Sequence, residues 1–140
     1  MQSTLVDSGP LIALFDRDDR FHAHVVAFLR ENPCRLHTTW PVLTEVCALL
    51  GEPAKLDFLA FVAAGGVAVE NLPLESIEEI LQLSHKYSDR PMDFAEASLV
   101  VLSQRCGLRE ILSVDADFDI YRLPRGKTFR NLLTAARHGR

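Results

Sequence analysis

Apolar residues follow two spacings that alternate along the chain. Short β-rich runs, typical of buried strands, cover residues 3–6, 35–38, 67–69 and 110–114, with a weaker fifth at 128–130. Between them, apolar residues three and four positions apart predict helices over 8–15, 21–30, 41–50, 53–63, 74–87 and 91–105. Alternating strands and helices predict one α/β domain, a three-layer sandwich with a central, mostly parallel sheet of four to five strands flanked by helices.

Prolines and a glycine mark the expected ends of several helices. Pro10, Pro41 and Pro91 each lie in the first turn of a predicted helix, where the missing backbone N–H is tolerated. Gly107 predicts the end of the helix that starts at Pro91. In the helix over 74–87, the spacing predicts one shared face that carries Ile77, Ile80, Leu81 and Ser84.

Four acidic residues lie among apolar neighbours, where a carboxylate is unfavourable unless it is paired or binds a metal. Asp7 ends the first apolar run, and Glu45 interrupts the apolar helix over 41–50. Asp93 precedes an apolar helical stretch, and Asp115 follows the fourth predicted strand. None of these segments holds a Lys or Arg that could neutralise its acid.

The expected topology brings these acids to one edge of the sheet. In a parallel sheet with crossover helices, ligands bind beyond the carboxyl ends of the strands. Asp7 and Asp115 follow two such ends, and Glu45 lies in the early turns of the helix that leaves the second strand. Asp93 lies in the first turn of the helix that leads into the fourth strand, and Glu96 shares its face.

Carboxylates alone, without Cys or His, are the ligands that hard cations such as Mg²⁺ and Mn²⁺ prefer. Such an ion can lower the pKa of a bound water and neutralise a phosphodiester. Each acid also has an ordinary structural explanation: Asp7, Asp93, Asp115 and Asp117 could cap helices or turns, and Glu45 could face solvent. The coincidence of four acids on one edge favours the metal site.

Four segments also resemble the acidic motifs of the PIN domain family, in order and in spacing. They are Leu-Val-Asp-Ser-Gly at 5–9, Thr-Glu-Val at 44–46, Met-Asp-Phe-Ala-Glu-Ala-Ser-Leu at 92–99 and Ser-Val-Asp-Ala-Asp-Phe at 113–118. The resemblance runs from Asp7 to about Asn131 and is strongest to the VapC-like ribonuclease toxins of toxin–antitoxin pairs. It implies a PIN-like sandwich, a homodimer, a cognate antitoxin, and Mg²⁺- or Mn²⁺-dependent endonucleolytic cleavage of RNA to 5′-phosphate and 3′-hydroxyl ends.

The resemblance also implies roles for individual residues. Asp7, Glu45, Asp93 and Asp115 match the catalytic acids of the family. Asp7, Asp93 and Asp115 would hold the metal, with Glu45 binding it directly or orienting the attacking water as general base. The auxiliary positions are Ser8, Ser113 and Asp117. Glu96 stands where the family commonly has Asp, which implies an auxiliary metal ligand.

The distribution of charge fits a protein that holds cations in one place and polyanions in another. The net charge is −4, yet all 19 acidic residues lie at or before Asp119, and six of the 15 basic residues follow it. We expect a nuclease domain over 1–131 and a basic tail over 132–140. Basic residues near the site, such as Arg17, Arg20 and Arg122, are candidates to position phosphates.

Neither a membrane-spanning apolar run nor a secretory signal is evident, so we expect a cytoplasmic protein. Two other functions compete with the nuclease. One is a catalytically silent PIN-fold module that binds protein or RNA, although the intact acid set disfavours it. The other is a receiver-type phosphotransfer domain, which needs a Lys after a later strand; Lys127 lies in a predicted turn instead.

Overall fold

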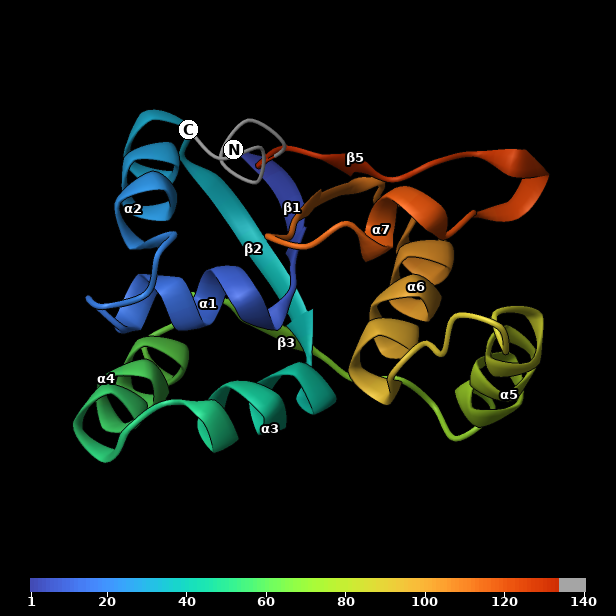
Figure 1. Cartoon of the computed structure of the whole chain (residues 1–140), viewed down its shortest axis with the longest axis horizontal. Coiled ribbons are helices and arrows are strands. Elements are labelled where there is room, and N and C mark those ends of the chain that lie inside the picture. The colour runs from blue at the N-terminus through green and yellow to red at the C-terminus, as the bar shows by residue number, and fades with distance from the viewer. Residues whose placement is uncertain (134–140) are drawn as a thin grey trace.

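The computed structural model describes residues 1–133 and contains one twisted sheet (Figure 1). Its strands are β1 (Gln2–Val6), β2 (Cys34–Thr39), β3 (Ala68–Glu70), β4 (Glu110–Leu112) and β5 (Arg130–Asn131). They lie in the order β3-β2-β1-β4-β5, and each neighbouring pair is parallel. The predicted α/β sandwich is confirmed. The basic tail expected at 132–140 lies largely outside the described residues.

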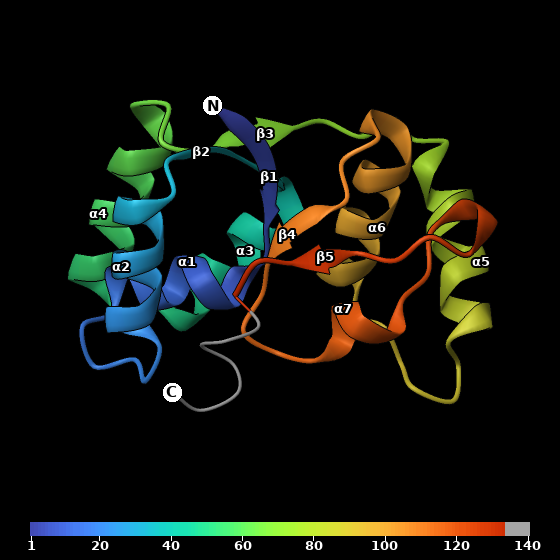
Figure 2. The ribbon, with the colours of Figure 1, turned by 90° about the horizontal axis from the view of Figure 1, so that it is seen from above.

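Helices cover the sheet in two groups (Figure 2). The first group is α1 (Ser8–Phe15), α2 (His22–Glu31), α3 (Trp40–Leu49) and α4 (Glu52–Ala63), in which α1 contacts the other three. The second group is α5 (Ser76–Lys86), α6 (Phe94–Cys106) and the short α7 (Asp117–Ile120), in which α5 packs on α6. A 3-10 turn, η1 (Pro124–Gly126), precedes β5. Among the described residues, no helix is long and apolar enough to cross a bilayer.

The core lies where β1 and β4 meet the helices on both faces. Leu5, Val6, Ile111 and Leu112 are fully buried or nearly so, as expected for central strands of a parallel sheet. Helix α6 is buried along most of its length, from Ala95 to Ser103. The acids therefore stand at the ends of rigid, well-packed elements rather than on long loops.

Several predicted boundaries were wrong, and each error has a local cause. Helix α6 starts at Phe94 rather than Pro91, because Asp93 adopts an extended N-cap conformation. Strand β4 ends at Leu112, where the Ser113 backbone hydrogen-bonds the side chain of Asn131 instead of continuing the ladder. That residue belongs to β5, which lies at 130–131 rather than 128–130.

The apolar face predicted for α5 is only partly buried. Its buried residues include Ile80 and Leu83, whereas Ile77 and Leu81 are 49% and 50% exposed. Two stripes of this helix have suitable spacing, and the protein buries the one that starts at Ser76. An apolar face of α5 therefore remains in contact with solvent.

Candidate metal centre

Asp7 stands at the carboxyl end of β1, where its backbone N–H continues the sheet by donating to the Leu112 carbonyl (3.0 Å). Its side chain is 3% exposed and caps α1 by accepting from the Ser8 N–H at 2.8 Å. The second carboxylate oxygen accepts from the Ser113 hydroxyl at 3.3 Å. Gly9 lies against the side chain of Val114, so a Cβ there would collide with it. This close approach keeps the start of α1 beside the loop that carries Asp115.

Asp93 and Glu96 form a capping box at the start of α6. The Glu96 N–H donates to Asp93 Oδ1 (2.7 Å), and the Asp93 N–H donates to Glu96 Oε1 (3.1 Å). The buried Tyr121 hydroxyl donates to the same Glu96 oxygen at 3.0 Å. The extra methylene of Glu relative to Asp lets this side chain reach back to the N-cap. Glu96 is therefore a structural residue as well as a candidate ligand.

Asp115 lies in the loop after β4, and Asp117 is the first residue of α7. The Ser113 hydroxyl accepts from the Asp115 N–H (3.3 Å), and Asp115 Oδ1 accepts from the Asp117 N–H (2.9 Å). The Arg90 guanidinium pairs with Asp117 at 2.9 Å. Ser113 thus links this loop to Asp7, as expected for a residue that orients acids.

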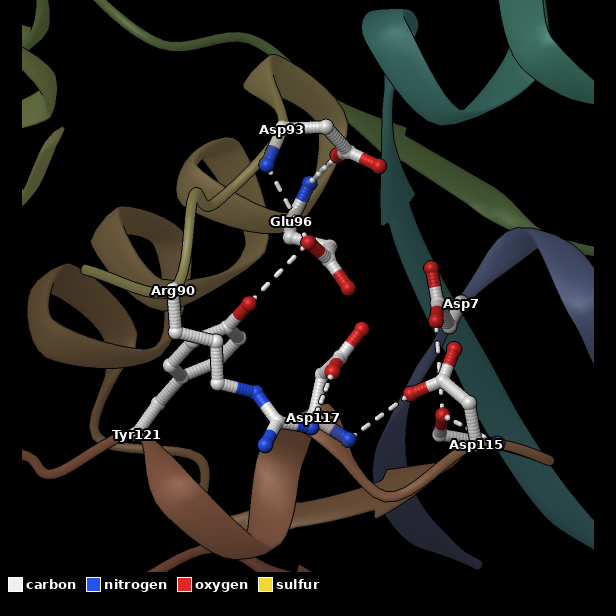
Figure 3. A network of polar contacts seen from close by, with 8 residues as sticks. Asp7, Arg90, Asp93, Glu96, Asp115, Asp117 and Tyr121 are labelled. Carbon is white, nitrogen blue, oxygen red and sulfur yellow. Dashed lines mark hydrogen bonds and ion pairs between the residues drawn. The ribbon is translucent and has the colours of Figure 1, made fainter. Parts of the chain in front are cut away.

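The acids from these segments converge on one space (Figure 3). One carboxylate oxygen each of Glu96, Asp115 and Asp117 lies within 4.8 Å of the others. The charges of Asp115, Glu45 and Asp93 all act on Asp7. Helix α3 places Glu45, which is half-buried, in a groove of about 560 Å³ that Asp93 also lines. The structure thus brings the predicted acids together and puts Glu96 and Asp117 in the tightest group.

Because these acids are crowded and buried, it is unfavourable for all of them to be ionised at once. Burial, with smaller contributions from the neighbouring acids, raises the pKa of Asp7 from 3.8 to about 7, although the Ser8 N–H opposes this. Burial also raises the pKa of Asp115. Burial and a hydrogen bond to Asp117 raise the pKa of Glu96 to about 9, and the same hydrogen bond, aided by Arg90, lowers the pKa of Asp117. Glu96 therefore holds a proton that it donates to Asp117 at neutral pH.

A hard dication fits this arrangement. The donors are all carboxylate oxygens, and an ion would replace the protons that Asp7 and Glu96 retain without it. In the part of the chain that the structure describes, no Lys or Arg forms an ion pair with Asp7, Glu45 or Asp93.

Two contacts of the cluster were not anticipated from sequence. Arg90 lies in a polar stretch before Pro91 and reaches Asp117 only because the loop before α6 folds over α7. Burial, and then the charge of Glu96, raise the pKa of the Tyr121 hydroxyl, so it stays a hydrogen-bond donor.

Of the proposed phosphate-binding residues, Arg122 donates to the carbonyls of its own turn, and Arg20 stacks over Phe21 at 4.8 Å.

Because Glu96 keeps its proton in the metal-free fold at pH 7 but loses it in the unfolded chain, Glu96→Gln, which is neutral in both states, should raise the unfolding free energy of the metal-free protein at pH 7. The amide still accepts from Tyr121 and donates to Asp117. Glu96→Ala should cost about 1–3 kcal/mol, because buried donors lose their acceptor. Urea denaturation in EDTA measures both. Equal destabilisation by Gln and Ala would contradict the protonated state.

Comparisons with known proteins agree with the fold. The model of the PIN domain matches residues 4–123. Ribonuclease VapC26 of Mycobacterium tuberculosis is 30% identical over 115 residues, which is 79% of this chain and 85% of that protein. The crystal structure of Mycobacterium tuberculosis VapC20, a sarcin–ricin loop cleaving toxin, has a TM-score of 0.77 at 21% identity and covers 84% of this chain and 93% of its own. At 21% identity, the similarity to the VapC20 structure shows a shared fold and no more.

Proposed function

This chain belongs to the PIN domain family, and we propose that it is a Mg²⁺- or Mn²⁺-dependent endoribonuclease that acts as the toxin of a toxin–antitoxin pair. The observation that carries the proposal is the convergence of carboxylates from four separate segments at the carboxyl edge of the sheet. The relative VapC26 is named a ribonuclease, which supports RNA as the substrate.

The residues of the site have different proposed roles, according to where each one lies. Asp7, Asp93 and Asp115 would hold the dication, with Glu96 and Asp117 as further oxygen donors. When bound, the ion supplies Lewis-acid chemistry that makes a water more acidic and offsets the charge of the phosphodiester. Glu45, on the wall of the adjoining groove, would accept the proton of the attacking water. Ser8 and Ser113 hold the Asp7 carboxylate in place through the hydrogen bonds described above.

Protein partners are part of the proposal. We propose a homodimer and a cognate antitoxin in the cytoplasm, as the family resemblance implies. Apolar side chains on α3 and α4 support a protein-binding surface: Leu49, Leu56 and Leu59 are 65%, 56% and 41% exposed. By contrast, the apolar residues Val25 of α2 and Phe58 of α4 belong to the core, since they are 1% and 0% exposed.

The test is cleavage of total cellular RNA by the purified protein with Mg²⁺, with Mn²⁺ and with EDTA. We expect discrete fragments with 5′-phosphate ends in either metal, none in EDTA, and recovery when Mg²⁺ is restored. Ligation of an adaptor that requires a 5′-phosphate reads out the ends. An intact RNA pool at every metal concentration would support the catalytically silent alternative, and fragments that also form in EDTA would contradict the metal dependence.

A further inference from the structure

An apolar cleft of about 280 Å³ lies beside the acids, between the first turns of α3 and α6, the segment after β3 and the start of α5. Residues that line it include Trp40, Asn71, Ser76, Ile80 and Phe94. The cleft is continuous with the site, because Trp40, Pro41 and Phe94 also line the groove that holds Glu45 and Asp93. A molecule bound at the acids can therefore extend directly into it.

Two exposed aromatic side chains stand at the boundary between groove and cleft. Trp40 is 59% exposed and Phe94 is 53% exposed, although each occupies the first position of its helix, next to buried core residues. The indole N–H of Trp40 donates to Asn71 Oδ1 at 2.8 Å, which fixes the orientation of the ring. Large rings held in place at a surface offer flat contact area at little entropic cost.

A buried hydroxyl in the same cleft has no partner. Ser76 is 2% exposed, and its Oγ makes no hydrogen bond to any described residue. The neighbouring Ser98 hydroxyl, which also lines the cleft, bonds the Ala95 carbonyl and the Thr39 hydroxyl, both at 2.6 Å. Leaving a buried hydroxyl unpaired is unfavourable, and Ser76 is a residue of the cleft lining whose hydroxyl has no partner among the described residues.

We propose that this cleft binds an unpaired base of the RNA substrate, stacked against Trp40 and Phe94 with its polar edge toward Ser76 and Asn71. Every base has an aromatic face for the rings and hydrogen-bonding groups on its edge. An aliphatic side chain of a protein partner would fill the space but leave the Ser76 hydroxyl unsatisfied. The inference rests on the proposed nuclease function, because it takes RNA as the occupant, and it defines the substrate as single-stranded near the cleavage point.

The sole tryptophan of the chain, Trp40, makes the binding step directly observable. Uridine and adenosine dodecamers are titrated into the protein in Ca²⁺, a hard cation that carboxylates also bind, while a gel verifies that the RNA stays intact. We expect saturable quenching of the Trp40 emission. Phe94→Leu should weaken the apparent affinity by about 5- to 150-fold, the range that base–aromatic stacking supports. Leu81→Ala, which removes a side chain of similar exposure on α5 that does not line the cleft, should have no effect.

Ser76→Ala separates recognition from folding. Removal of a hydroxyl without a partner should leave the melting temperature unchanged or raise it. The same variant should lose discrimination among RNAs that differ only in the base next to the cleavage point. Its KM should change for the preferred sequence, whereas its kcat should not.

The outcomes distinguish this inference from the proposed function. Mg²⁺-dependent cleavage by the parent, together with unquenched Trp40 and an unchanged KM in Phe94→Leu, would overturn the base-binding cleft and leave the nuclease intact. Quenching that depends on Phe94, without cleavage in any metal, would support the cleft and reject the nuclease. If the Trp40 emission shifts to the blue as the protein concentration rises and does not change with RNA, a second copy of the chain occupies the cleft. That result would overturn the inference.

Discussion

Asp93→Asn is expected to lower Mg²⁺-dependent RNA cleavage at least about 100-fold, since loss of even an outer partner of a metal ligand costs 10–100-fold. The same change should raise the melting temperature of the metal-free protein. The charge of Asp93 acts on Asp7, Glu96 and Asp115, and in each case it raises the pKa of the neighbouring acid. Its removal therefore relieves repulsion at three positions.

The substitution keeps the local fold. Asparagine caps helices about as well as aspartate, and its oxygen can still accept from the Glu96 N–H. A drop in activity can therefore be assigned to lost charge rather than to a frayed α6. The stabilisation that Mg²⁺ gives the parent should disappear in the variant, as measured by thermal denaturation with and without Mg²⁺.

Asp57→Asn is the matched control, because Asp57 is an exposed carboxylate on α4. It should leave the cleavage rate and the Mg²⁺-dependent melting shift unchanged. If Asp93→Asn lowers the melting temperature of the metal-free protein, the acids do not repel one another in the folded state. If Mg²⁺ stabilises this variant as much as the parent, the ion binds elsewhere.

The sequence predicted the sheet well because central parallel strands are buried on both faces. The runs at 3–6 and 110–114 each indicated a strand; the first ends at Val6 as predicted, and the second ends at Leu112, two residues before its predicted end. The positions of Asp7 and Asp115 follow from those ends and from the topology alone. The gathering of the acids was therefore predictable before any side-chain contact was known.

Contacts that depend on tertiary structure were not predictable in the same way. The ion pair between Arg90 and Asp117 joins a loop to the start of α7, and no periodic pattern relates the two residues. The burial of Ser76 on α5 was not predictable, because periodicity alone does not mark a polar residue as buried. A helix cap by Asp93 was among the alternatives, but the reciprocal capping box with Glu96 and the hydrogen bond from Tyr121 were not anticipated. The catalytic and metal-binding roles remain predictions.

Asp7→Asn should stabilise the metal-free protein above pH 7 by on the order of 4 kcal/mol, the free energy that corresponds to a pKa of about 7 instead of 3.8. Asparagine retains an oxygen for the Ser8 N–H and an amide that can donate to Ser113. The folded parent binds the Asp7 proton more tightly than the unfolded chain does. The contribution of Asp7 to the stability of the folded protein is therefore fully present below about pH 4 and is lost as the pH rises toward 7.

Urea denaturation in EDTA at several pH values measures this dependence. In the parent, the decline should be steepest between pH 4 and 7, where Asp7 and Glu96 both contribute, and weaker up to pH 9, where Glu96 continues alone. The stability of Asp7→Asn should show only the decline with pH that Glu96 causes. The stability of Asp57→Asn should vary with pH as that of the parent does. Identical profiles for the parent and Asp7→Asn would mean that Asp7 is already ionised in the fold.

The stabilisation that Mg²⁺ gives the parent should depend on pH with the opposite sign. An ion at the acids must displace the protons that Asp7 and Glu96 hold, so the competition weakens as the pH rises. The stabilisation by Mg²⁺ should therefore grow from pH 5 to pH 8, where the metal-free parent is weakest. Asp7→Asn lacks both the proton and the charge at this position, so its response to Mg²⁺ should be small and should vary with pH only through Glu96. A parent whose Mg²⁺ stabilisation is independent of pH would show that the ion does not meet these carboxylates.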